Sequence, residues 1–318
     1  MNRDASRVEL SIISPVYLGA TMVEELVDQI KESLQRGGVQ SYEIVLVEDG
    51  SPDDSWSEIE RLCERHKEVV GIKLTRNFGQ HPAISAGLRC ARGEYVVVLD
   101  CDLQDDPRYL CDILEALRGG APVVFARKGR REHSLFKNMT ARLFNLLFNQ
   151  LAEIRGVTGD DQIGSFSGLS RAVVDEFNKI TDVHRHYLMI VRWLGFPITY
   201  IDVIHRLRFE GKSSYSFPKL VKHAVDGLTS QSTKLLRLFV IAGFLFCFAS
   251  LAALALLVGL YFLYGFKEGW ASVIALMLLS TGVIVFSLGI VGVYVGQILE
   301  QARQRPLFII EKVVSEYE

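Results

Sequence analysis

Short apolar runs alternate with amphipathic segments along residues 8–127. The apolar runs are rich in β-branched residues and nearly continuous, which is typical of strands buried on both faces. The segments between them repeat apolar residues at helical spacing. This order predicts an α/β fold with a mostly parallel sheet covered by helices on both faces. The expected strands are 8–16, 42–49, 69–76, 94–102 and 121–128, and the expected helices are 21–36, 54–66, 79–91 and 107–118.

The next part of the chain completes this domain. Residues 161–209 predict a loop, two helices and a final strand, 198–209. Trp193, in the segment "IVRWLGF", is expected to lie in the core. We place the resulting α/β domain at residues 1–209.

The hydropathy pattern changes character after this domain. Residues 216–237 place apolar side chains on one side of a helix and basic ones on the other, which is typical of a helix lying on an anionic bilayer. Packing of this helix on the globular domain is the alternative. Residues 238–266 and 271–299 carry no charge, and each is longer than the about 20 residues that span a bilayer. A two-helix transmembrane hairpin is therefore expected at 238–299, after a loop and surface helix at 210–237.

Basic residues flank both expected spans and predict the orientation. They are Lys234 and Arg237 before the first span, and Arg303, Arg305 and Lys312 after the second. This bias puts both termini, including the tail 300–318, in the cytoplasm. Glycines on the second span permit close helix packing, so a homo-oligomer through the membrane is a further expectation.

Charge and cysteine content exclude some classes of protein. The 35 basic and 37 acidic residues nearly cancel, so the chain has no overall field that would attract nucleic acid. The five cysteines show no paired spacing, which favours reduced thiols. The N-terminus has no apolar segment typical of a signal peptide.

Carboxylates gather where two expected strands end. Asp100 and Asp102 follow the strand of "VVVLDCDLQDDP", and Asp49 follows the strand of "VEDGSPDD". Ligands bind at the carboxyl ends of parallel strands, and Mg²⁺ typically takes one or two carboxylates together with substrate phosphates. Asp49 is a candidate acceptor for a nucleobase or ribose, although the residues of this stretch taken alone favour turn and cap chemistry. Asp105 and Asp106 are expected to start the next helix.

Several stretches together resemble family-2 glycosyltransferases. They are "SPVY", "EDGS", the run from Arg76 to Pro107, and "GKSSYSF" ahead of the expected hairpin. The resemblance extends over essentially the whole chain and is nearest to bacterial polyprenyl-phosphate glycosyltransferases, relatives of dolichyl-phosphate mannose synthase. It implies a GT-A fold in a multi-pass protein of the bacterial inner membrane. The implied reaction is inverting transfer of a sugar from a nucleotide sugar, a UDP-hexose or UDP-N-acetylhexosamine, to polyprenyl (undecaprenyl) phosphate.

The resemblance also implies roles for single residues. Asp100 and Asp102 match the motif that binds Mg²⁺ or Mn²⁺ with the diphosphate, with Asp102 as the direct ligand. The matching donor-binding residues are Pro15, Tyr17, Asp49, Arg76 and Gln80. Leu18 departs from the polar residue that often follows in the family.

A second departure concerns the general base. Many relatives read G-D-F-R-L where this chain has Ser165 and Ser167, and Asp160 and Asp161 just upstream could supply a carboxylate instead. The loss is tolerable because a lipid phosphate, with a second pKa of about 6, is already a nucleophile at neutral pH.

Basic and hydroxyl-bearing residues before the expected surface helix are candidates for binding the acceptor phosphate. The candidates are Arg206, Arg208, Lys212, Ser213 and Tyr215. Arg208 is the first choice because a guanidinium binds phosphate through two donors. A solvated strand edge is the alternative. Two other functions stay open, namely a glycosyltransferase for another lipid or a saccharide, and a non-catalytic membrane partner.

Overall fold

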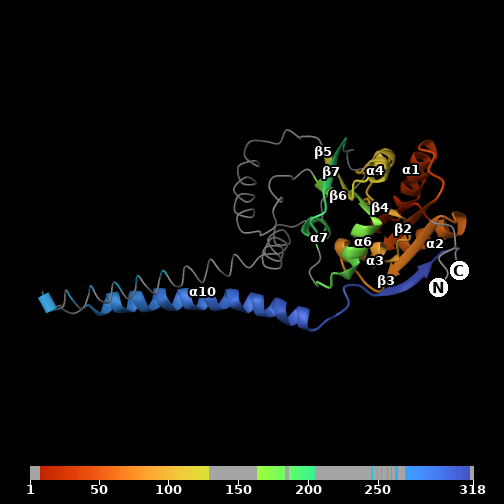
Figure 1. Cartoon of the computed structure of the whole chain (residues 1–318). Helices are drawn as coiled ribbons and strands as arrows, with labels where there is room; N and C mark the ends of the chain where they lie inside the picture. Colours follow the sequence, from red (N-terminus) through yellow and green to blue (C-terminus); the bar gives the residue numbers. More distant parts are fainter. Residues whose placement is uncertain are drawn as a thin grey trace. The chain divides into compact units, whose positions relative to one another are not determined.

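The computed structural model describes residues 8–128, 163–182, 186–204 and 269–315, with isolated positions between 245 and 263. The chain divides into two compact units. One comprises Met1–Lys137, Gly159–Ser214 and Pro306–Glu318, and the other comprises Asn138–Thr158 and Tyr215–Arg305. Figure 1 shows the elements of both.

The first unit is built on an eight-stranded sheet with the order β7-β5-β6-β4-β1-β2-β3-β8. Neighbouring strands pair in parallel except where β6 and β8 take part, so the mostly parallel sheet predicted from the sequence is confirmed. The strands are β1 (Leu10–Val16), β2 (Tyr42–Glu48), β3 (Val69–Leu74), β4 (Tyr95–Val98), β5 (Val123–Lys128), β6 (Ile163–Ser170), β7 (Ile198–Val203) and β8 (Ile310–Val314).

Helices cover both faces of this sheet, as the near-continuous apolar strands require. One face packs against α1 (Val23–Arg36), α2 (Ser55–Arg65) and α4 (Leu110–Arg118), the last preceded by the short η1 (Pro107–Tyr109). The other face packs against α3 (Gln80–Cys90), α6 (Arg171–Lys179) and α7 (Tyr187–Trp193). Each face has its own core of fully buried aliphatic side chains, and successive residues of β1 enter opposite cores.

Two strands were missed by the sequence prediction. β6 occupies part of the expected loop, and its "IGSFSGLS" sequence lacks a strand-like apolar run because helices press closely on it. A Cβ placed on Gly168 would lie 2.4 Å from Ile113 Cγ2, so only glycine fits there. β8 lies in the expected tail. It is a strand because it pairs with β3, which is far away in the sequence, so no local pattern predicts it.

The prediction that Trp193 lies in the core is wrong. Its side chain is 67% exposed, whereas Tyr187 and Val191 of the same helix are buried. The reason is that α7 buries the face formed by Tyr187, Ile190 and Val191, and Trp193 lies away from that face.

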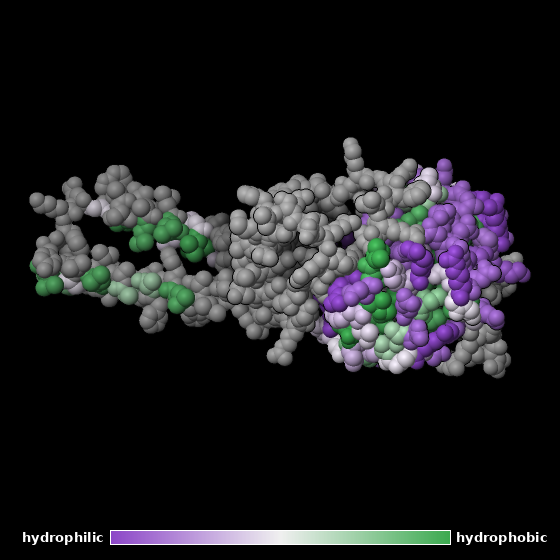
Figure 2. Space-filling model, turned by 90° about the horizontal axis from the view of Figure 1, so that it is seen from above, coloured by the Kyte–Doolittle hydropathy of each residue, from purple (hydrophilic) through white to green (hydrophobic). Residues whose placement is uncertain are grey.

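The second unit contains α10 (Trp270–Ala302), which corresponds to the second expected span. Its segment Leu279–Gly296 has a mean hydropathy of 2.0 and no residue buried against the protein. Among the described residues it is the one helix long and apolar enough to cross a membrane. Figure 2 shows hydrophobic residues along the second unit, whereas much of the visible surface of the first unit is hydrophilic. The expected surface helix 216–237 and most of the first expected span lie outside the described residues.

We predict that the sheet depends on β8. Ending the chain after Phe308 removes β8 and exposes the edge of β3 from Gly71 to Leu74. The melting temperature of the detergent-solubilised protein should fall by roughly 5–10 °C, because losing about 2–3 kcal/mol shifts it by about 2–4 °C per kcal/mol at this size. Lys312→Ala is the control, since it removes only an exposed ion pair to Glu60. Equal melting of the truncated and full chains would contradict the prediction.

Candidate active site

A cavity of about 290 Å³ opens at the carboxyl ends of β1, β2 and β4. It collects residues from four separate stretches of the sequence. Its walls are Pro15, Val16, Tyr17, Asp49, Asn77, Gly79, Gln80, Asp100, Cys101 and Asp102. The structure thus brings together all the predicted donor and metal residues except Arg76. This side chain bonds Asn77 O at 3.1 Å and lies over the Phe78 ring at 4.0 Å.

The two carboxylates after β4 occupy a turn with little freedom. Gln80 Nε2 donates to Asp100 Oδ1 at 2.7 Å, and Gln104 N donates to Asp102 Oδ1 at 3.1 Å. Leu103 has a φ of +59°, a left-handed conformation that reverses the chain after Asp102. Between the carboxylates, burial raises the pKa of the Cys101 thiol to about 12, so this side chain serves packing rather than chemistry.

The residues present fit a hard divalent cation bound together with a substrate. Asp100 and Asp102 are oxygen donors in one cavity, and Gln80 fixes one of them. Within the described part of the chain, no group of three or more His, Cys, Asp or Glu side chains could hold a metal ion alone. Two carboxylates suit Mg²⁺ or Mn²⁺ only if phosphate oxygens and water complete the coordination.

Asp49 holds a turn as well as lining the cavity. Its Oδ1 accepts from Phe78 N at 2.7 Å and its Oδ2 from Gly79 N at 2.8 Å. Burial raises the pKa of this carboxyl, although the two backbone hydrogen bonds oppose the shift. The turn chemistry expected from the sequence is present, and the remaining lone pairs of the carboxylate are available to a ligand in the cavity.

Gly50 lets the backbone after β2 pass directly against this turn. Its φ is +59°, and a Cβ placed there would lie 2.2 Å from Asn77 N and 2.3 Å from the carbonyl carbon of Arg76. No side chain fits in that position. Gly50 and Asp49 together therefore set the position of residues 76–79.

The aspartates further along the "DCDLQDDP" stretch have structural roles, as predicted. Asp106 is the N-cap of η1 and accepts from Arg108 N at 3.1 Å and from its Nη2 at 2.6 Å. Asp105 is buried as well.

Ser167, which stands where other relatives have the arginine of G-D-F-R-L, is buried in β6, and its hydroxyl lies 2.8 Å from Tyr187 Oη. The predicted carboxylates and acceptor-binding residues lie outside the described residues, namely Asp160, Asp161, Arg206, Arg208, Lys212, Ser213 and Tyr215. Gly79 and Cys101 were not among the predicted site residues, although they lie within the "RNFGQ" and "DCD" stretches.

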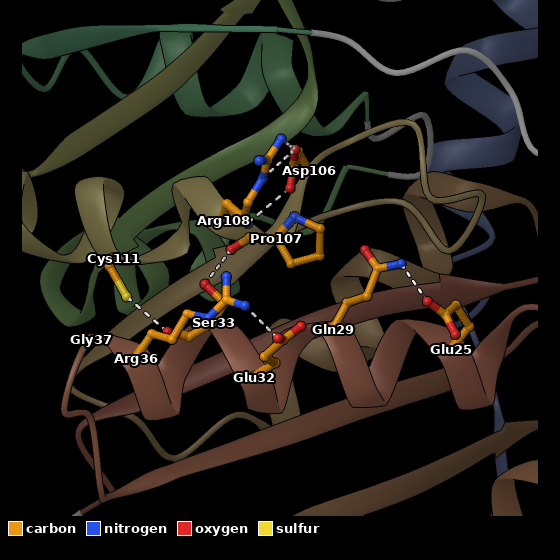
Figure 3. Close-up of a pocket in the computed structure, with 10 residues that line it drawn as sticks. All are labelled: Glu25, Gln29, Glu32, Ser33, Arg36, Gly37, Asp106, Pro107, Arg108 and Cys111. Carbon is orange, nitrogen blue, oxygen red and sulfur yellow. Dashed lines mark hydrogen bonds and ion pairs between the residues drawn. The ribbon is translucent and has the colours of Figure 1, made fainter.

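A larger hollow of about 610 Å³ lies between α1 and the segment from Asp106 to Cys111 (Figure 3). Its polar side chains are paired with one another, through Arg36 with Glu32, Arg108 with Asp106, and Gln29 with Glu25. None of the predicted donor, metal or acceptor residues lines it. The smaller cavity is therefore the candidate active site.

Comparison with known proteins identifies the class. Residues 11–177, more than half of the chain, match the family described as "Glycosyl transferase family 2". The uncharacterized glycosyltransferase YkcC of Bacillus subtilis is 32% identical over 96% of this chain and 94% of its own length. This chain belongs to glycosyltransferase family 2. The sequence-based assignment of the family and of an enzyme is thereby confirmed.

Other similar proteins extend the comparison for this glycosyltransferase. The undecaprenyl-phosphate 4-deoxy-4-formamido-L-arabinose transferase of Pseudomonas fluorescens is 32% identical over 96% of this chain and 89% of its own. The solved structure of mannosyl-3-phosphoglycerate synthase from Rubrobacter xylanophilus aligns with a TM-score of 0.51 and 17% identity, over 74% of this chain and 75% of its own. This likeness supports the predicted GT-A fold.

We predict that Gly50→Ala lowers glycosyltransferase activity. The new methyl group displaces Arg76 and Asn77, and a loss of about 1.4 kcal/mol in transition-state stabilisation is a tenfold fall in kcat/KM. Gly38→Ala is a matched control, because Gly38 has a similar φ of +68° with nothing within 4 Å. Both variants bear the backbone strain, and only Gly50→Ala should lose about tenfold in a kinetic assay. Equal activity of the two variants would contradict the close approach as the cause.

Proposed function

We propose that this glycosyltransferase transfers a sugar from a nucleotide sugar to polyprenyl phosphate at the cytoplasmic face of a bacterial inner membrane. The observation that carries the proposal is the cavity that joins Asp100 and Asp102 to Asp49, Tyr17 and Gln80 at the carboxyl ends of parallel strands. Relatives similar over 95% or more of this chain, named undecaprenyl-phosphate transferases, support the acceptor.

The donor is proposed to be a UDP-hexose or UDP-N-acetylhexosamine. Its nucleotide lies against Pro15, Tyr17 and Asp49, with Asp49 accepting hydrogen bonds from the base or ribose through its remaining lone pairs. Gln80, which lines the cavity, and Arg76, close to it in the sequence, are proposed to serve the donor side of the site. Asp102 and Asp100 would hold Mg²⁺ or Mn²⁺, which when bound neutralises charge on the departing diphosphate.

The acceptor is proposed to bring its own nucleophile. A lipid phosphate is mostly dianionic at neutral pH, so its oxygen attacks the anomeric carbon in line and inverts the configuration without removal of a proton. Asp160 or Asp161, just upstream in the sequence, is proposed to supply the carboxylate that many relatives have at the position of Ser165. Cationic and hydroxyl donors that position the phosphate are proposed at Arg206, Arg208, Lys212, Ser213 and Tyr215.

The pairing of β8 with β3 supports a membrane hairpin. β8 follows α10 in the chain, yet it belongs to the same sheet as the strands that precede the apolar region. If α10 crosses the bilayer, the chain must cross an even number of times between β7 and β8 to return to the same side. The uncharged segment 238–266 is the other stretch of the sequence with sufficient length and hydropathy, so it is proposed as the first span.

The proposed organisation keeps four regions. They are the cytoplasmic GT-A domain 1–209, the acceptor loop and surface helix 210–237, the hairpin 238–299 and the cytoplasmic tail 300–318. The tail contributes β8 to the catalytic sheet and is therefore proposed as a part of that domain. A homo-oligomer is proposed through the glycines of α10, which are Gly282, Gly289, Gly292 and Gly296.

We predict that the purified protein converts polyprenyl phosphate into a glycosyl phosphate. The assay offers a panel of nucleotide sugars with Mg²⁺ or Mn²⁺, and the lipid products are identified by mass spectrometry. Asp102→Asn should lower transfer by at least about 10²–10³-fold while the far-UV circular dichroism spectrum stays unchanged.

The outcomes of this assay separate the alternatives. A glycosyl phosphate is cleaved by mild acid, whereas a product stable to mild acid would show a lipid glycoside and overturn the phosphate acceptor. Absence of any product, together with absence of nucleotide-sugar binding in calorimetry, would indicate a non-catalytic membrane partner. Near wild-type transfer by Asp102→Asn would contradict the role of this carboxylate.

We predict also that both ends of the apolar region face the cytoplasm. Alkaline phosphatase inserted between Lys267 and Gly269 should be active, because only the periplasmic enzyme forms its disulfides. The same enzyme fused after Glu318 should be inactive, and a fluorescent protein fused there should fluoresce. Active alkaline phosphatase at the C-terminus would contradict the hairpin and the pairing of β8 in the membrane-bound protein.

A further inference from the structure

The turn from Tyr17 to Ala20, between β1 and α1, is held by side chains from the segment after β2. Three consecutive backbone N–H groups of the turn each donate to a different side-chain oxygen of that segment. The bonds are Leu18 N to Ser51 Oγ (2.8 Å), Gly19 N to Ser55 Oγ (3.0 Å) and Ala20 N to Asp53 Oδ2 (3.2 Å). The two segments are more than 30 positions apart in the sequence.

Asp53 is one of the three acceptors and also orients the other two, Ser51 and Ser55. The hydroxyls of Ser51 and Ser55 both donate to its Oδ1, each at 2.5 Å. A hydroxyl that donates its proton in this way presents lone pairs to the turn, so the carboxylate fixes both serines as acceptors. Burial of Asp53 opposes its charge, yet the hydrogen bonds from the serines and Ala20 outweigh it and lower the pKa of the carboxyl.

The held turn has a conformation that its sequence does not favour. Leu18 has a φ of +53°, in the left-handed region where residues other than glycine, asparagine and aspartate are strained. Its side chain is 51% exposed, so burial does not compensate for this strain. The hydrogen bonds to the segment after β2 stabilise the turn in this strained conformation.

The same turn forms one wall of the donor cavity. Tyr17 lines the cavity together with Asp100, Cys101 and Asp102. Gly19 lies near the Cys101 thiol, since a Cβ placed on it would be 3.5 Å from Cys101 Sγ. The turn therefore lies against the segment that bears the two carboxylates, and the group around Asp53 holds it through hydrogen bonds.

We propose that Ser51, Asp53 and Ser55 are positioning residues for the donor, and we name these three the turn latch. The latch holds Tyr17–Ala20 in the conformation that receives the nucleotide sugar, and none of its members lines the cavity. The proposal rests on the proposed function for the identity of the ligand. It follows that loss of the latch weakens binding of the donor and leaves binding of the lipid acceptor unchanged.

The test compares Asp53→Asn with Asp54→Asn in the full-length protein. Asp53 accepts hydrogen bonds through both of its carboxylate oxygens, whereas the side chain introduced by Asp53→Asn has one acceptor oxygen. Its NH₂ group would face N–H or O–H donors and could not accept from them. Asp54 is the adjacent carboxylate, it is exposed, and its side chain makes no cap hydrogen bond to α2. We expect amide hydrogen exchange at residues 18–20 to accelerate at least about tenfold in Asp53→Asn and to stay unchanged in Asp54→Asn.

Kinetics then separate positioning from a merely structural role. Asp53→Asn should raise the KM for the nucleotide sugar at least about tenfold while the KM for polyprenyl phosphate stays within about twofold. Unchanged exchange at the turn would overturn the latch. Faster exchange with an unchanged donor KM would overturn its positioning role. The exchange measurement needs no substrate, so a failure of the proposed reaction would not change what it shows about the latch.

A second pair of variants covers poor folding of Asp53→Asn. Ser51→Ala removes the acceptor for Leu18 N, whereas Ser51→Thr retains the hydroxyl on a side chain that is only partly buried. We expect Ser51→Thr to keep the donor KM within about twofold of wild type and Ser51→Ala to raise it by about fivefold or more. Equal donor KM values for the two variants would overturn the proposal.

Discussion

The site depends on side-chain oxygens that accept hydrogen bonds from the backbone of its turns. Where a strand ends, backbone N–H groups lose their partners in the sheet, and each buried one needs another acceptor. Asp49 supplies two for the turn before α3, the turn latch supplies three for the turn before α1, and Asp106 supplies one for η1. The first two of these turns line the cavity, and residues 49–55 hold both of them. This stretch after β2 therefore fixes the position of both turns that line the cavity.

This constraint explains why aspartates crowd at two strand ends. Sequence reasoning divided the "DCDLQDDP" cluster into Asp100 and Asp102 for chemistry and Asp105 and Asp106 for the helix start. In the structure Asp100 and Asp102 line the cavity, and Asp106 caps η1. The division was possible because a carboxylate before proline at a helix start has a local signature. The role of Asp53 was not predictable in this detail, because its partner Ala20 is distant in the chain and nothing local indicates the contact.

The same limit applies to the fold: elements with a local sequence pattern were predicted, and elements that depend on contacts with distant residues were missed. Strands buried on both faces have a strong local pattern, so β1 to β5 and the helices between them were found. β6 carries glycine and serine where Ile113 and Tyr187 press on it, so packing removed the apolar run that identifies a strand. β8 is short and follows an apolar segment, and only pairing with β3 makes it a strand. For Trp193 the local signal misled the prediction. A large aromatic residue was expected in the core because of its type, but it lies on the exposed side of its helix.

The charge of the cavity limits what can enter it. Among the described residues that line it are three carboxylates, from Asp49, Asp100 and Asp102, and no lysine or arginine. Arg76 is directed to Asn77 O and the Phe78 ring. A diphosphate alone would meet repulsion from Asp100 and Asp102, and a divalent cation between them reverses the sign of that interaction. The same carboxylates would therefore select for a donor that arrives with its metal ion, and the held turns keep the neighbouring wall at a fixed position while it binds.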